Sequence, residues 1–282
     1  MRVLGLALLA ASMGCAASRT ASWDVKTGGA GADPALVKQG DDAWAKRDDR
    51  AQLEAAIAAW DKATAGGGDC ETLTKLARAY YLLADGHIFF EGEASKDKYL
   101  QTHEKGITAG ERALATCSPA FRERMAAGKK MEDSLDTIDA KSVPALYWYT
   151  TNLGKWGNAQ GLATVLKYKA KIKAQIERIL ALDEHFFYSA AHRYLGVIYA
   201  RAPAIAGGDM KKAGEHFEAS LKHSPNYLAT TVLWAEFYAV KAEDKKGFQE
   251  QLEWVMKQPD DLIPEVAPEN KIEKKKAERL LK

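Results

Sequence analysis

Apolar side chains recur every three or four residues from about Pro34 to Leu281, and no stretch alternates apolar and β-branched positions with polar ones. A spacing of three and four places apolar side chains on one face of an α-helix, whereas strands alternate with a period of two. Turn signals rich in glycine and proline interrupt the pattern at 66–68, 207–208, 224–226 and 258–259. The sequence therefore predicts an all-α protein built of helical hairpins over residues 34–282.

Small and aromatic residues in the C-terminal third match the tetratricopeptide repeat, a helix-turn-helix of about 34 residues. Small side chains let paired helices approach, and aromatic side chains fill the space between neighbouring hairpins. The first clear unit carries Leu195, Gly196, Tyr199, Ala213, Phe217, Ser220 and Pro225. Pro259 follows Pro225 by 34 residues, which equals the repeat period. We therefore predict a tetratricopeptide-repeat-like α-solenoid that ends in a capping helix over 268–282.

One turn between two predicted helices, IAGGD at 205–209, is longer than the repeat requires. Tyr199 and Ala213 are separated by five residues more than in the repeat template, and the excess falls on 203–207. A phosphate-binding loop would lie between a strand and a helix, whereas this stretch joins two helices. We interpret the two glycines as turn residues, Asp209 as the cap of the following helix, and the enlarged loop as the rim of a groove.

The first fifteen residues, MRVLGLALLAASMGC, carry one arginine, a short apolar run and then small residues. The run is about half of the roughly 20 apolar residues that a spanning helix needs, so residues 1–15 predict an export signal. The end of this segment resembles a lipobox in which Cys15 becomes the lipidated first residue, although Ser12 stands where leucine is usual. Plain secretion with cleavage near Ala17 is the alternative. The glycine-rich residues 16–33 predict a flexible tether.

The predicted location is the periplasmic side of the cell envelope. Because Ala17 is not aspartate, the resemblance to Gram-negative lipoproteins favours a lipid anchor in the outer membrane. Export also means an oxidising compartment, where Cys70 and Cys117 can pair once Cys15 carries lipid. Cys70 begins one helix of a predicted hairpin and Cys117 ends the other, so the antiparallel arrangement makes them neighbours. We predict a disulfide between them, with two buried free thiols as the alternative.

Charge and motifs point away from catalysis and nucleic acid. The chain has 40 basic and 38 acidic side chains, mixed along the helices, and a formal net charge of +2. It contains no G-x-S-x-G, P-loop or H-E-x-x-H motif, so we expect neither an enzyme nor a cofactor. His185 and His192 are seven residues apart, as are His216 and His223, but none has the tight spacing of a metal motif. We predict surface or groove histidines and no metal.

The segment ALYWYTTNLGKWGN at 145–158 has the most unusual local composition of the chain. Trp148, Asn152 and Trp156 share one helix face, next to Tyr147, and two large aromatic rings around an amide suit a ligand or peptide groove. Ordinary packing between repeats is the alternative. A second helix adds three residues that can face the same side, namely His192, Arg193 and Tyr199.

The segments ARAYYLLADGH, ALYWYTTNLGKW, RYLGVIYARAP and APEN, together with residues 207–241, resemble the T-component family of tripartite ATP-independent periplasmic (TRAP) transporters. The resemblance covers nearly all of the chain from about residue 34 to 281. It implies an exported lipoprotein with tetratricopeptide-like helices that associates with the periplasmic solute-binding P component. It also implies a groove or pore for a hydrophobic ligand.

We therefore expect a lipid-anchored adaptor of a TRAP-type uptake system. Its partners would be the P component, the membrane and a small apolar ligand. The P component and the ligand would bind through the face that carries Trp148, Asn152, Trp156, His192 and Tyr199. A general envelope scaffold that holds peptide segments in the same grooves is the alternative. The sequence leaves open whether the chain forms a homo-oligomer and which solute is transported.

Overall fold

The computed structural model describes residues 16–21, 23 and 31–282, and all regular structure in them is helical. The predicted all-α fold is confirmed. The α-helices are α1 (Pro34–Trp44), α2 (Arg50–Ala63), α3 (Cys70–Gly86), α4 (Lys96–Cys117), α5 (Pro119–Ala126), α6 (Val143–Ala159), α7 (Leu162–Leu182), α8 (Phe186–Arg201), α9 (Met210–His223), α10 (Leu228–Leu233), α11 (Lys245–Lys257) and α12 (Ala267–Leu281). Six 3-10 helices connect them among the described residues: η1 (Ile88–Glu91), η2 (Glu93–Ser95), η3 (Glu132–Thr137), η4 (Ala140–Ser142), η5 (Ala204–Ala206) and η7 (Pro264–Val266). The element η6 (Trp234–Ala239) is a π-helix.

Aspartate side chains fix the starts of several helices. Asp49, Asp69, Asp209 and Asp244 precede α2, α3, α9 and α11, and each accepts a hydrogen bond from the backbone N–H three residues further on. Such a bond satisfies an N–H that has no partner within the helix. The predicted capping role of Asp209 is therefore confirmed, and the loop before it serves as a turn.

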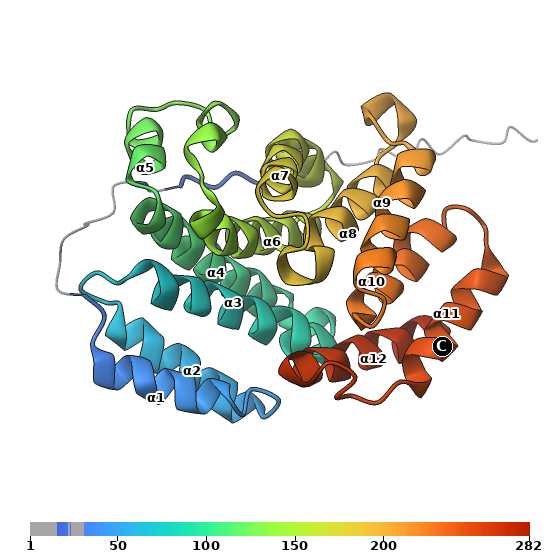
Figure 1. The fold of residues 1–282 in the computed structure, drawn as a ribbon, viewed down its shortest axis with the longest axis horizontal. Coiled ribbons are helices and arrows are strands. Elements are labelled where there is room, and N and C mark those ends of the chain that lie inside the picture. The colour runs from blue at the N-terminus through green and yellow to red at the C-terminus, as the bar shows by residue number, and fades with distance from the viewer. Residues whose placement is uncertain (1–15, 22, 24–30) are drawn as a thin grey trace, which may run out of the picture.

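Helices that follow one another pack side by side as hairpins, α1 with α2, α3 with α4, α6 with α7 and α8 with α9 (Figure 1). This arrangement agrees with the predicted solenoid. The α4 and α6 helices also pack against each other, and glycine permits their close approach. A Cβ atom at Gly110 of α4 would lie 2.8 Å from the Cα atom of Tyr149 of α6, which is too short for two carbon atoms.

The C-terminal helix α12 lies beside α3 as well as α10 and α11 (Figure 1). Lys276 of α12 lies 2.6 Å from Asp85 of α3, and Glu269 pairs with Arg78 at 2.8 Å and with Arg47 at 2.9 Å. These ion pairs join the end of the chain to its first third. A repeat pattern predicts a helix that caps the last hairpin, but it does not predict this contact with α3.

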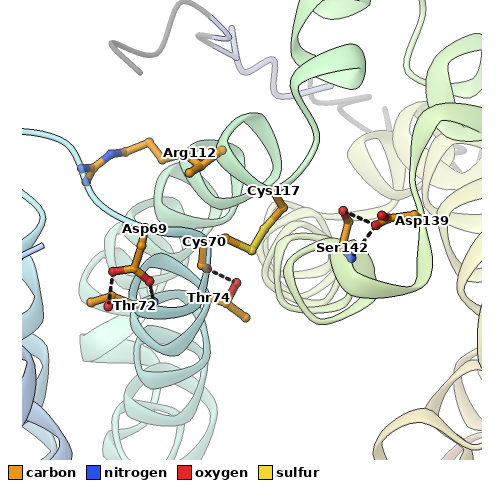
Figure 2. The surroundings of a disulfide bond; sticks show 9 residues. Asp69, Cys70, Thr72, Thr74, Arg112, Cys117, Asp139 and Ser142 are labelled. Carbon is orange, nitrogen blue, oxygen red and sulfur yellow. Dashed lines mark hydrogen bonds between the residues drawn. A yellow bond between two sulfur atoms is a disulfide. The ribbon is translucent and has the colours of Figure 1, made fainter. Parts of the chain in front are cut away.

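Figure 2 shows the disulfide that joins the start of α3 to the end of α4. The Cα atoms of Cys70 and Cys117 are 5.0 Å apart, within the range that a disulfide spans. Beside it, Asp69 accepts hydrogen bonds from the backbone N–H of Thr72 at 2.8 Å and from its hydroxyl at 2.7 Å. The bridge therefore lies where one helix start and one helix end already meet.

The first described residues, which fall in the segment interpreted as a tether, lie against the helical body. The N–H of Ala17 donates to Thr164 Oγ1 at 2.9 Å, and the Arg19 guanidinium pairs with Glu111. Trp23 is only 8% exposed and packs into the core. These residues are bound to α4, α6 and α7 rather than extending away from them.

Cys15 and the predicted export signal over residues 1–15 lie outside the described residues, so lipidation stays a prediction. Among the residues that the structure describes, no helix is both long and apolar enough to cross a bilayer. The longest of them, α4, has 22 residues, but charged side chains recur along it.

Candidate functional site

Several of the unusual side chains of the aromatic helix α6 are buried in the core. Asn152 is fully buried, and its amide donates to the carbonyl of Ala77 at 3.0 Å. Trp156 is 2% exposed, and its indole N–H donates to Glu104 Oε1 at 2.9 Å. Packing and hydrogen bonding therefore account for both residues, and neither lines the two spaces described below. Of the two interpretations of this helix face, ordinary packing describes Asn152 and Trp156.

Three of the predicted binding residues, Tyr147, Trp148 and Arg193, line a cavity of about 60 Å³, here called the inner cavity. It lies between α3, α6, α8, α10 and α12, so it exists only because the C-terminal helix packs against α3. Most of its other lining side chains are aromatic or charged. They are Arg78, Tyr81, Asp85, Lys155, Phe187, Tyr194, Tyr227, Glu269, Glu273 and Lys276.

One wall of the inner cavity is a buried ion network centred on Asp85, which lies 2.5 Å from Lys155 Nζ and 2.6 Å from Lys276 Nζ. Burial alone would raise the pKa of Asp85, but the two ammonium groups hold it well below its usual range. Burial disfavours the charged lysines too, but Asp85 keeps the pKa of both above the usual value. All three groups are therefore charged at neutral pH.

Another part of the cavity lining carries a buried charge that forms no ion pair with a described carboxylate. Arg193 is 2% exposed, and its guanidinium donates to the carbonyls of Tyr188 at 2.9 Å and Phe187 at 3.4 Å. The ring centroid of Tyr227 lies 4.7 Å from Arg193 Cζ. Among the described residues, Arg193 forms no ion pair with a carboxylate. Carbonyls and aromatic faces solvate this charge without neutralising it.

The carbonyls that Arg193 binds belong to a left-handed turn at the start of α8. Phe187, Tyr188 and Ser189 have φ angles of 44°, 59° and 55°. Residues other than glycine adopt this conformation at a cost of roughly 1–2 kcal/mol each, so the surroundings must hold it in place. The bonds from Arg193 and the contact of Phe187 with the Trp148 ring, at 5.1 Å between centroids, provide that support.

A second space, here called the outer groove, has a volume of about 190 Å³ and lies between α6, α7 and α8. Its lining is mainly apolar and includes Leu162 and Leu166, which are 68% and 48% exposed. Ala202 and Pro203 also line it, and Pro203 is the residue by which the enlarged loop at 203–207 contributes to the groove. A groove lined by apolar side chains is a candidate surface for a ligand or a partner.

Three side chains, Lys155, Tyr194 and Leu233, line both the outer groove and the inner cavity. They therefore lie between the two spaces. Tyr194 is held there by its hydroxyl, which lies 3.3 Å from the hydroxyl of Tyr81, and Lys155 by its pairing with Asp85. The charged, aromatic inner cavity and the apolar outer groove are thus separated by the same three side chains.

His192 and Tyr199 line neither space. Nδ1 of His192 lies 2.9 Å from Nδ1 of His216 on α9, and the Tyr199 ring stacks on the same imidazole with an interplanar angle of 6°. Consecutive helical residues point about 100° apart, so Arg193 can face the cavity while His192 faces α9. The predicted single face is therefore divided between two sides of α8.

Apart from Arg193, the charged residues of the inner cavity were not predicted from the sequence. Asp85 and Lys276 are far apart in the chain and meet through the packing of α12 on α3. One signal was present in the sequence, because Asp85 follows the otherwise apolar run AYYLLA, where an aspartate needs a buried partner. The identity of that partner could not be read from spacing.

Comparison with known families agrees with the resemblance predicted above. A protein-family model described as TRAP transporter T-component matches residues 88–282. The chain belongs to this family. No curated protein was found to match the sequence.

The T-component match extends from η1 to the end of α12, so it includes the outer groove and all walls of the inner cavity except the one from α3. The T-component is an accessory part of a transporter and not a known enzyme family, and membership implies association with the cell envelope. An accessory role in TRAP transport is therefore the functional assignment at this level.

Proposed function

We propose that this T-component binds an amphipathic organic anion and presents it to the periplasmic solute-binding P component. The anionic head would occupy the inner cavity, and the apolar part would follow the outer groove. The observation that carries the proposal is the buried guanidinium of Arg193, which has no acidic partner among the described residues. The ligand expected from the sequence was purely apolar, and the charge in the cavity changes that expectation.

The electrostatic argument is that a buried charge is costly unless another charge offsets it. Asp85 is already balanced by Lys155 and Lys276, and Glu269 pairs with Arg78 and with Arg47 from outside the cavity. Glu273 lies 2.8 Å from Lys276. Arg193 is the remaining cation, so a carboxylate or similar anion would supply the missing opposite charge.

The apolar part of such a ligand would need a continuous path out of the cavity. Lys155, Tyr194 and Leu233 border both spaces, and rotation of long or aromatic side chains is a common way to open a wall. Once past them, an alkyl or aryl group would meet Leu162 and Leu166, whose exposed surface it would cover. In this proposal the charge of Arg193 selects an anionic head group, and burial of apolar surface on the tail contributes most of the binding free energy.

The lipid anchor proposed at Cys15 would fix the orientation of this groove. The N–H of Ala17 donates to Thr164 Oγ1 near the start of α7, and Ala17 follows Cys15 by two residues in the sequence. Leu162 and Leu166 flank Thr164 on α7. A lipid on Cys15 would therefore hold the mouth of the outer groove at the membrane surface, with the P component approaching from the periplasm.

The test compares two ligands of equal length, octanoate and octan-1-ol, by isothermal titration calorimetry. The acid is expected to bind and the alcohol to bind at least about tenfold more weakly, because only the acid can offset the charge of Arg193. Equal affinity for the two would contradict the assignment of the head group. Native mass spectrometry of the purified protein adds a second readout, in which a bound extended peptide would favour the envelope-scaffold alternative.

Leu166→Glu tests the outer groove, because it places a negative charge beside the proposed tail. Octanoate affinity and capture of the solute-binding subunit from the same TRAP system should both fall. Met256→Glu is the matched control, since Met256 is also an exposed apolar residue, at 36%, and lies on α11 away from the groove. A variant at Leu166 that binds as well as this control would remove the groove from the proposal.

A further inference from the structure

Four of the six histidines gather with one glutamate where α8 begins and α9 ends. Nε2 of His192 lies 3.1 Å from Glu184 Oε1, and Nδ1 of His223 lies 4.0 Å from the same oxygen. The ligand atoms of these three side chains all lie within 4.8 Å of one another. His185 and His216 adjoin them, with ring centroids 4.7 Å from His223 and 5.2 Å from His192.

The antiparallel packing of α8 and α9 explains why the histidines meet. His216 and His223 are seven residues apart on one side of α9, and the antiparallel packing of α8 and α9 places His185 beside His223 and His192 beside His216. The residue numbers of the two opposed pairs add up to the same total, as a fixed register requires. Spacing within one helix gives no metal motif, but the register between two helices assembles one.

One of the two tautomers of His192 leaves a nitrogen of the cluster suited to a metal. A single proton must lie between Nδ1 of His192 and Nδ1 of His216, which are 2.9 Å apart. When His192 donates this proton, its Nε2 carries a lone pair that faces the carboxylate of Glu184. In that tautomer a metal ion between the nitrogen and the carboxylate oxygen would join the two acceptors, and Nδ1 of His223 lies 4.0 Å from the same oxygen.

We propose that Glu184, His192 and His223 form a binding site for Zn²⁺ or a similar divalent transition metal. The ligand atoms would be Glu184 Oε1, His192 Nε2 and His223 Nδ1, a set of imidazole and carboxylate groups that suits Zn²⁺. In a tetrahedral site with metal–ligand bonds of 2.0–2.1 Å, neighbouring ligand atoms are about 3.3 Å apart. Two pairs of ligand atoms lie 3.1 and 4.0 Å apart and the third lies within 4.8 Å, so side-chain movements of about 1 Å or a little more reach that geometry.

His216 would act as the outer partner that orients the metal-binding imidazole of His192. Its own ring is fixed by stacking on Tyr199. A second hydrogen bond of this kind sets the tautomer of a ligating histidine and raises metal affinity. The fourth coordination position is open on the partly exposed side of the site, where His185, water or a side chain of a partner protein can bind.

The site lies close to the inner cavity without sharing its ligands. His192 precedes Arg193 in α8, and Glu184 stands just before the left-handed turn that Arg193 holds. A metal would therefore tie both ends of that turn to α9. We expect Zn²⁺ to protect the protein against thermal unfolding, because a ligand that binds only the folded state stabilises it.

The experiment titrates Zn²⁺ into the full protein, prepared without a polyhistidine tag and stripped with a chelator. We expect one equivalent to bind, and Co²⁺ to give the intense visible absorption of a tetrahedral nitrogen and oxygen site. His223→Ala should weaken Zn²⁺ binding by at least about tenfold and abolish the Co²⁺ band, and His216→Ala should weaken binding by roughly 10–100-fold. Failure of Zn²⁺ to bind the wild type would overturn the proposal.

His87→Ala is the matched control, because His87 is a partly buried histidine at the end of α3 and lies outside the cluster. It should bind Zn²⁺ as the wild type does. His223 is an exposed residue near a helix end, so its replacement should leave the far-ultraviolet circular dichroism unchanged. Equal losses in the two variants, or unchanged binding in His223→Ala, would show that the metal binds elsewhere.

Discussion

Two regions of the molecule bury polar groups in opposite ways. In the layer of α3, α4 and α6, Asn152 satisfies its amide with His103, at 2.9 Å, and with the carbonyl of Ala77. Around the inner cavity, between α3, α8 and α12, the buried groups are charged, and Arg193 has no acidic partner among the described residues. In the first region hydrogen bonds between polar groups fix the packing of the helices. The second region contains a cavity and a buried guanidinium without a carboxylate partner.

This difference locates function better than the aromatic content does. Both regions are rich in aromatic rings, but only the second combines rings with a cavity and an unbalanced charge. In a packed polar network the buried polar groups satisfy one another through hydrogen bonds, so no ligand is needed to account for them. The buried cation Arg193 is solvated by carbonyls and rings but has no acidic partner among the described residues, which is where the proposed anion would bind. Perturbing each region separately should therefore reveal different behaviour.

The largest expected effect is on the first region and comes from its disulfide. Replacing Cys70 and Cys117 together by serine should lower the free energy of unfolding by about 4 kcal/mol, because the bridge closes a separation of 47 residues in the unfolded chain. Chemical denaturation under non-reducing conditions measures the difference. Mass spectrometry of the non-reduced wild type is the control, and two free thiols there would contradict the prediction.

The second region should respond most to Asp85→Ala. Removal of this carboxylate leaves Lys155 and Lys276 without their shared partner, and breaking a buried ion pair costs about 3 kcal/mol or more. Urea denaturation should show the loss. A further Lys155→Met change, which removes one of the stranded charges, is expected to restore part of the stability. A double variant less stable than the single one would argue against charge as the cause.

Acid should weaken the first region through His103. Burial lowers the pKa of His103 to about 4, well below its ordinary value, while its hydrogen bond to Asn152 raises it only in part. The unfolded chain therefore binds a proton that the folded chain does not, and stability falls as the pH drops through the unfolded pKa. Between pH 7 and pH 5 this contributes a loss of about 2 kcal/mol.

The control for this pH effect is His103→Gln, which keeps an amide donor and does not titrate. Burial also lowers the pKa of His87 and His216, but both remain in the variant and cancel in the comparison. Asp85 stays charged across this range, since its pKa is held well below its usual value. An identical loss of stability in wild type and variant between pH 7 and pH 5 would rule out His103 as the cause.

The sequence predicted the elements of the fold more fully than the site. Three-and-four periodicity and the aspartate before α9 were sufficient for the helices and for the capping role of Asp209. Long-range packing was not accessible in the same way. The pairing of Lys276 with Asp85, and with it the inner cavity, depends on where α12 comes to rest.

The aromatic helix α6 shows the limit of reasoning from composition. Spacing correctly placed Trp148, Asn152 and Trp156 on one stretch of helix, but it could not distinguish a groove from a helix interface. In the structure Trp148 lines the inner cavity, whereas Asn152 and Trp156 are buried in the core. The histidine cluster was hidden for a related reason, because its members are spaced for contact between helices rather than within one.

The smallest expected effect sharpens the contrast between buried and exposed charge. Arg50 and Glu54 form an ion pair on the surface of α2, with N and O atoms 2.9 Å apart and side chains 35% and 49% exposed. Glu54→Ala should lower the free energy of unfolding by only about 0.3 kcal/mol, since water screens both groups in either state. The same denaturation assay that registers Asp85→Ala should barely detect it. A loss approaching that of Asp85→Ala would mean that ion pairs stabilise this chain regardless of burial. That result would contradict the larger energetic contribution assigned to the buried charges around the inner cavity.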